Sequence, residues 1–184
     1  MKKTSSIKEA LLQVTFVTTI FLITSCNNHN DNDAAYNNNK KERDVEFLVN
    51  AAEINLEQIK LGKLAQQIGR TTHVQELGKI MEDAHTKSRN DLTALAKSKR
   101  IAIPTSPTHH AKDVYKILNE KGNDFDKAYA DRMVSSNQDA IESFEIASVD
   151  SYNPDIKNWA KVSLPDLRIH LDHSIVCQKK CDSR

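Results

Sequence analysis

The chain is poor in the residues that interrupt regular structure. Its 184 residues include four glycines and four prolines, and aromatic residues make up 5% of the total. Sheet proteins need frequent turns and favour aromatic and β-branched residues, whereas the Ala, Leu, Lys, Glu and Gln that recur here favour helix. The composition therefore argues against a sheet-rich fold and predicts an all-α protein.

An excess of charge of one sign is also absent. The formal net charge is +1, and without residues 1–25 the chain has 23 basic against 24 acidic residues. A nucleic-acid-binding domain needs a basic surface to neutralise phosphates. We therefore expect no nucleic-acid partner.

The longest apolar segment is too short for a transmembrane helix. It runs from Leu11 to Ile23 behind Lys2 and Lys3, whereas a spanning helix needs ~20 predominantly apolar residues. A basic start, a short apolar run and small residues in that order are typical of a cleaved secretory leader. We predict that residues 1–25 are a signal peptide.

The residues that close this segment, Ile23-Thr24-Ser25-Cys26, have the pattern of a bacterial lipobox. Processing at this motif attaches a diacylglyceryl group, and usually a further acyl chain, to Cys26. One acyl chain binds a membrane marginally, but two or more anchor it stably. The motif predicts a protein of the bacterial cell envelope that is held at the membrane by a lipid anchor.

The segment after Cys26 is an asparagine-rich, low-complexity stretch. Polar sequence of this kind buries too little apolar surface to become ordered. We predict that residues 26–39 form the lipidated cysteine and a disordered tether, and that residues 40–184 form one helical domain.

Apolar residues recur at spacings of three and four in that domain, which predicts amphipathic helices. The first should run from Lys40 to Ile68, and the second from a capping box of Thr72 and Gln75 to about Arg100. The third should begin at Asn123 or Asp124. The fourth should begin at Pro154 behind the capping residue Asn153, with a kink or break at Pro165.

A short helix over residues 111–119 is predicted within the connection between the second and third long helices. Four apolar stripes must be buried against one another, which makes a four-helix bundle. The connection between the second and third long helices is long enough for the crossover that is seen in ferritin-like bundles.

Several motifs in this order resemble the bacterial envelope family catalogued as domain of unknown function 4142. The resemblance covers about residues 44–175. It is carried by Ala51-Ala52, Glu57, Leu61 to Ala65, Met81, His85, Phe125-Asp126, Tyr129, Met133-Val134, Leu164-Pro165 and His170-Leu171. It implies a ferritin-like bundle, an outer-membrane or periplasmic location and no established activity. This chain departs from the family pattern at Ala84, usually Asp, and at Asn137, usually His.

Glu57, His85 and His170 are the candidate ligands for a transition metal, such as iron, manganese or zinc, inside the bundle. Di-iron bundles place carboxylates and histidines on facing helices, and Glu57 and His85 lie on apolar helix faces. The set is incomplete because the third helix offers Asn137, which is a poor ligand for such ions. Two alternatives stay open, a hydrogen-bonded polar layer and a small-molecule or other catalytic site.

Two cysteines other than Cys26 occur in the chain, Cys177 and Cys181. Helical side chains four apart have Cβ atoms ~5–6 Å apart, and a disulfide needs ~3.5–4.5 Å. A disulfide therefore requires the last turn to unwind, and two thiols or an intermolecular bridge are the alternatives.

Two functions follow from these features. The first is a non-enzymatic envelope lipoprotein, at the outer membrane and facing the periplasm or the cell surface, whose bundle binds an envelope partner or contributes to stress tolerance. The alternative is a ferritin-like metal-binding or oxidative protein that uses Glu57, His85 and His170.

Overall fold

The computed structural model describes residues 29–183, whose regular elements are all helices with no strand among them. The elements are α1 (His29–Ile68), α2 (Thr72–Lys99), α3 (His109–Asn119), the 3-10 helix η1 (Gly122–Asp124), α4 (Phe125–Asp150) and α5 (Pro154–Asp182). The predicted all-α class is confirmed. The predicted signal peptide and Cys26 lie outside the described residues, and none of the described helices is long and apolar enough to cross a membrane.

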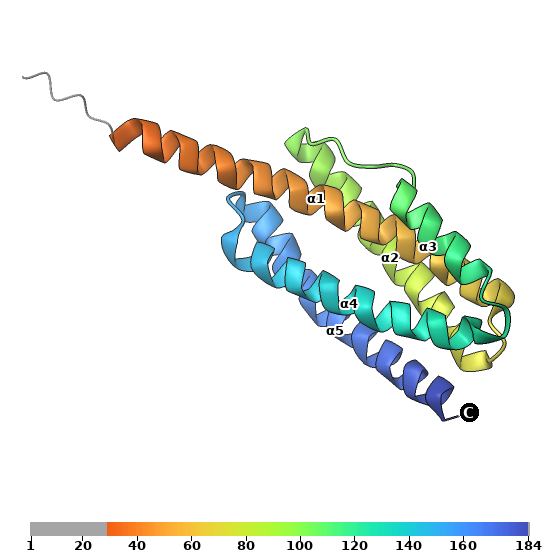
Figure 1. Ribbon diagram of the computed structural model, residues 1–184. Helices are drawn as coiled ribbons and strands as arrows, with labels where there is room; N and C mark the ends of the chain where they lie inside the picture. Colours follow the sequence, from red (N-terminus) through yellow and green to blue (C-terminus); the bar gives the residue numbers. More distant parts are fainter. Residues whose placement is uncertain (1–28, 184) are drawn as a thin grey trace, which may run out of the picture.

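The long helices pack as two pairs, α1 with α2 and α4 with α5 (Figure 1). The pairs also meet through α1 with α4 and through α2 with α5, while α3 lies against α1 and α4. Residues 100–124, which include the predicted short helix, join the two pairs. This connection runs the length of the molecule, because Ile101 packs in one core cluster and Phe125 in the other.

The buried apolar residues form two clusters. The first core includes Phe47, Leu48, Leu92, Phe144, Ile156 and Leu167, with Trp159 packed against it. The second core includes Leu61, Leu64, Leu77, Met81, Phe125, Tyr129, Met133 and Cys177. The residues of both cores follow the three-and-four spacing seen in the sequence.

The start of α1 differs from the sequence prediction. The helix begins at His29 rather than at Lys40, so the described part of the asparagine-rich segment is helical and not irregular. Extending an existing helix costs far less than nucleating one, and the later turns of α1 are fixed by packing. Lys40 also places its Nζ 4.9 Å from the centre of the Tyr36 ring.

The helix ends agree with the sequence in one case and differ in another. The Asn153 side chain accepts hydrogen bonds from the Asp155 and Ile156 amides, as predicted for a cap. The predicted capping box at α2 is wrong, because Thr71 is the capping residue and Gln75 donates to the Gly69 carbonyl at 2.7 Å. Polar groups at the start of a helix can be bound by side chains outside the capping pattern, which the local sequence does not reveal.

α5 continues without a break past Pro165. A proline removes one backbone donor and strains the preceding turn. Leu164 and Leu167 are both buried on either side of it, and their packing holds the helix in place. The predicted break is therefore absent.

Candidate functional site

The four long helices surround a cavity of about 180 Å³ in the first core, here called the central pocket. Its apolar lining comes from Ala51, Ile54, Ala84, Ala140, Phe144, Trp159 and Leu167, and its uncharged polar lining from Asn55, His85, Ser88, Ser163 and His170. Lys87, Asp91 and Asp166 complete it with charged groups. A largely apolar cavity with a few polar groups is the usual form of a small-molecule site.

His85 and Asn55 are the most deeply buried polar side chains of the pocket. The Nδ1 of His85 lies 2.8 Å from Asn55 Oδ1. Because this oxygen can only accept, Nδ1 carries the proton and Nε2 is a hydrogen-bond acceptor. Burial, and then the neighbouring His170, lower the pKa of His85 to about 3. At neutral pH, His85 is therefore an uncharged imidazole, and its buried Nε2 has no partner among the described residues.

His170 faces His85 from α5, with ring centroids 5.7 Å apart. Burial lowers the pKa of His170, although Asp166 opposes this effect and His173 adds to it. Its buried Nδ1 also lacks a hydrogen-bond partner in the described part of the chain. The two imidazoles thus bring unused hydrogen-bonding atoms to one pocket.

Glu57 does not join them. Its carboxylate accepts hydrogen bonds from Nε of Arg132, at 3.0 Å, and from Nη2 of the same side chain. Within residues 29–183, the ligand atoms of Glu57, His85 and His170 do not come within 4.8 Å of one another as one group. The structure brings two of the three predicted ligands together, and this geometry does not favour a metal bound by all three.

Other buried polar side chains form hydrogen bonds within and between the helices. Gln58 Nε2 donates to Ser136 Oγ at 2.6 Å. Asn137 Nδ2 donates to the Met133 carbonyl at 2.8 Å and to Ser174 Oγ at 3.2 Å. Asn137, which stands where the family pattern has a histidine, is therefore part of a hydrogen-bonded polar layer.

Sequence reasoning missed Asn55, the partner of His85. One signal was present, since Ala51, Asn55 and Gln58 share the three-and-four spacing of a buried face, and all three are buried. Trp159 is half-buried, packs against the first core and lines the central pocket.

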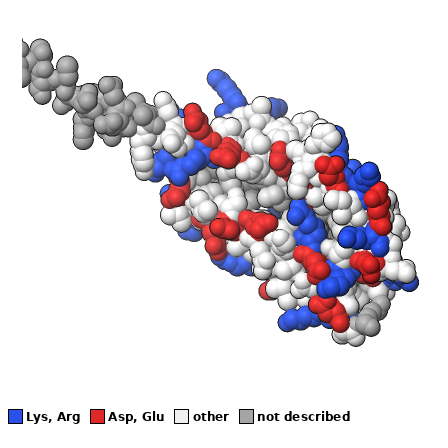
Figure 2. Space-filling model, viewed as in Figure 1, with Lys and Arg blue, Asp and Glu red and all other residues white. Residues whose placement is uncertain are grey.

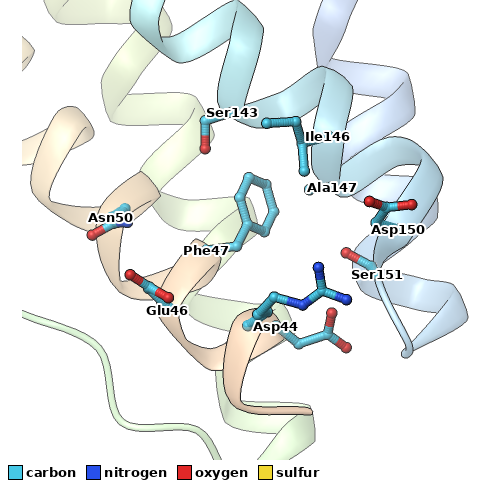
Figure 3. Close-up of a pocket in the computed structure, with 10 residues that line it drawn as sticks. Asp44, Glu46, Phe47, Asn50, Ser143, Ile146, Ala147, Asp150 and Ser151 are labelled. Carbon is cyan, nitrogen blue, oxygen red and sulfur yellow. The ribbon is translucent and has the colours of Figure 1, made fainter. Parts of the chain in front are cut away.

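A second hollow lies between the middle of α1 and the end of α4, around Phe47 (Figure 3). Its buried acid, Asp44, accepts hydrogen bonds from the backbone amides of Tyr152 and Asn153, at 3.1 and 2.8 Å. Both carboxylate oxygens thus hold the turn before α5. We interpret this hollow as structural.

The charged side chains form no site of one sign on the face viewed in Figure 2, where basic and acidic groups alternate. Over residues 29–183 the structure records no bond between Cys177 and Cys181. α5 stays helical as far as Asp182, so the last turn has not unwound in the way that a disulfide requires.

Comparison with known proteins identifies one family. A family model described as "Domain of unknown function (DUF4142)" matches residues 30–175. This confirms the resemblance seen in the sequence. No curated protein and no solved structure matches the chain.

Proposed function

The chain belongs to the DUF4142 family, and we propose that this member is a lipid-anchored envelope protein whose helical domain binds a small amphiphilic molecule. The anchor is supported by the sequence before residue 27. The binding role is supported by one observation above all. The buried Nε2 of His85 has no partner in the described chain and belongs to a pocket formed by all four long helices.

We further propose that the architecture is a ferritin-like four-helix bundle. Two packed helix pairs joined by a connection that runs the length of the molecule are the features that support it. Bundles of this kind build binding sites from side chains on facing helices. The central pocket has that construction.

The anchor would be attached at Cys26, with the domain at the outer membrane, facing the periplasm or the surface. Growing cells with an alkyne-tagged fatty acid tests this. We expect label on the chain, loss of the label in Cys26→Ser, and full label in the control Cys181→Ser. Label that persists in Cys26→Ser would overturn the anchor, and membrane fractionation would separate inner from outer membrane.

The chemistry of the pocket limits the ligand. An acceptor at His85 Nε2 needs a hydroxyl or amine donor, while Phe144, Trp159 and Leu167 need an apolar body. A cavity of ~150 Å³ in another protein holds a benzene-sized ligand, and this pocket is about 180 Å³. The expected ligand is therefore a small, compact molecule that carries one hydrogen-bond donor.

Trp159 makes the proposal testable, because it is the one tryptophan of the chain and lines the pocket. Cyclohexanol can be titrated into the full-length protein, reconstituted in phospholipid vesicles, while Trp159 fluorescence is followed. We expect a saturable change with cyclohexanol, and binding about tenfold weaker with cyclohexane, which has no donor.

Replacing His85 by Leu should weaken cyclohexanol binding about tenfold, the value of one hydrogen bond. The control His173→Gln changes an exposed histidine on α5 and should bind like the unmodified protein. A response that rises linearly with cyclohexanol, or one that His85→Leu leaves unchanged, would overturn the proposed binding site.

A further inference from the structure

A second group of side chains capable of binding a ligand lies in the second core, away from the central pocket. His73 is in the first turn of α2, and Cys177 and Cys181 are near the end of α5. One ligand atom from each lies within 4.8 Å of the other two. His73 Nε2 and Cys181 Sγ are 3.5 Å apart.

These distances match those around a tetrahedral zinc ion. With Zn–S of about 2.3 Å and Zn–N of about 2.0–2.1 Å, a sulfur and a nitrogen bound to one ion are about 3.6 Å apart. The same geometry places two sulfurs about 3.8 Å apart. We propose that His73, Cys177 and Cys181 bind a zinc ion that joins the start of α2 to the end of α5.

The helical backbone favours a metal over a disulfide. Cys177 and Cys181 are one turn apart on an intact helix, where Cβ atoms are ~5–6 Å apart. A disulfide needs ~3.5–4.5 Å, but an ion can bridge the two sulfurs without unwinding. The soft thiolates select zinc over magnesium or calcium, which prefer oxygen ligands.

A buried hydroxyl beside the cluster supports the site independently. The Tyr129 side chain is fully buried, and its hydroxyl has no hydrogen-bond partner among the described residues. Burial raises the pKa of Tyr129, and Tyr129 and Cys177 both belong to the second core. A metal-bound Cys177 thiolate would give this hydroxyl an acceptor.

Asp126 of α4 positions the cluster. Its Oδ1 accepts from the Arg70 amide at 2.8 Å, and its Oδ2 accepts from the Thr71 hydroxyl at 2.7 Å. Both carboxylate oxygens thus fix the residues just before His73. Three protein ligands leave the fourth position of a tetrahedral ion for water.

The test uses the full-length protein, purified in detergent under reducing conditions and without a histidine tag. We expect one zinc per chain by elemental analysis. Replacement with Co²⁺ should give the sulfur-to-cobalt charge-transfer absorption of thiolate ligands. Cys177→Ser or His73→Gln should weaken zinc binding more than about 100-fold, since even partners outside the ligand shell are worth 10–100-fold.

His110→Gln, an exposed histidine in α3, is the matched control and should bind zinc normally. Circular dichroism checks that each variant is folded, and the cobalt spectrum of the unmodified protein needs no variant at all. The proposal is overturned if the protein binds no zinc, if cobalt binds without the thiolate bands, or if mass spectrometry finds a Cys177–Cys181 disulfide in protein from cells. Cyclohexanol binding at the central pocket is a separate readout, so either proposal can fail alone.

Discussion

The two cores differ in how their side chains fill space. In the first core the rings of Phe47, Phe144 and Trp159 meet with centroids 4.9–5.8 Å apart, and the central pocket lies beside them. In the second core α1 and α2 approach at Gly62 and Gly78, where an added Cβ on Gly78 would lie 2.7 Å from the Gly62 carbonyl oxygen. Large tilted rings border the pocket of the first core, whereas small residues bring α1 and α2 into close contact in the second core.

The unpaired buried atoms differ in the same way. The central pocket has the imidazole nitrogens of His85 and His170 and the amide nitrogen of Asn55, and the second core has the hydroxyl of Tyr129. The unpaired atoms of the central pocket line an open volume and can contact an organic molecule. The Tyr129 hydroxyl belongs to the same core as Cys177.

The largest expected difference between the two cores is in the stability that each loses when a buried leucine is shortened to alanine. Leu61 is fully buried in the second core, so Leu61→Ala should lower the free energy of unfolding by about 4 kcal/mol. Leu167 already lines a cavity, so Leu167→Ala should cost about 2 kcal/mol. Urea denaturation measures both values, and equal losses would show that the two cores are packed alike.

Acid should weaken the first core through His85. Its pKa is about 3 in the folded protein against an ordinary value of 6.5, so the unfolded chain binds more protons between those values. The contribution of uncharged His85 to stability is fully present above pH 6.5 and is lost as the pH drops toward 3. The free energy of unfolding should fall by about 2 kcal/mol between pH 7 and pH 5.

His85→Gln should remove this part of the pH dependence, measured by urea denaturation across that range. His170, Asp166 and His173 face the same region, and burial lowers the pKa of His170 as well. Some dependence will therefore stay in the variant. A variant whose stability falls with acid as steeply as that of the unmodified protein would contradict the assignment to His85.

A methyl group at Gly78 should strain the second core. The added Cβ would lie 2.7 Å from the Gly62 oxygen and 2.8 Å from Ala65 Cβ. Overpacking costs about 1–3 kcal/mol, so we expect Gly78→Ala to lose about 2 kcal/mol of stability and to lower the melting temperature. Thr86→Ala, exposed on the same helix, is the control and should change little. A stabilised Gly78→Ala would show that α1 and α2 are not in close contact.

The smallest expected effect is at Tyr129. Removing an unpaired buried hydroxyl relieves a desolvation cost, so Tyr129→Phe should leave the metal-free protein within about 1 kcal/mol of the unmodified one, or stabilise it. Thermal unfolding in a chelator measures this. A clear loss of stability would mean that the hydroxyl has a hydrogen-bond partner even without metal.

Much of the fold could be read from local pattern. The cap at Asn153, Pro154 at the first helical position and the end of α1 at Ile68 agree with the structure, because caps and apolar spacing act within a few residues. The early start of α1 and the unbroken helix at Pro165 could not be predicted from local pattern, because packing and helix extension outweigh local preference there.

The candidate sites were less predictable. His85 was identified because a histidine on an apolar stripe faces the interior, and His170 because di-iron bundles place ligands on facing helices. Glu57 was assigned to the same site, but its partner Arg132 is 75 residues away in sequence. His73 was not considered, because its distance from Cys177 in sequence hides the contact that the helices create.

The sequence by itself determined the helical class, the family and the presence of interior-facing polar residues, because these depend on composition, spacing and motif order. The tertiary structure alone decided which of those residues meet. His85 faces His170 across a pocket, Glu57 pairs with Arg132, and His73 comes beside two thiols. Periodicity fixes the face of a helix on which a residue lies, whereas its neighbour on another helix depends on how the whole chain packs.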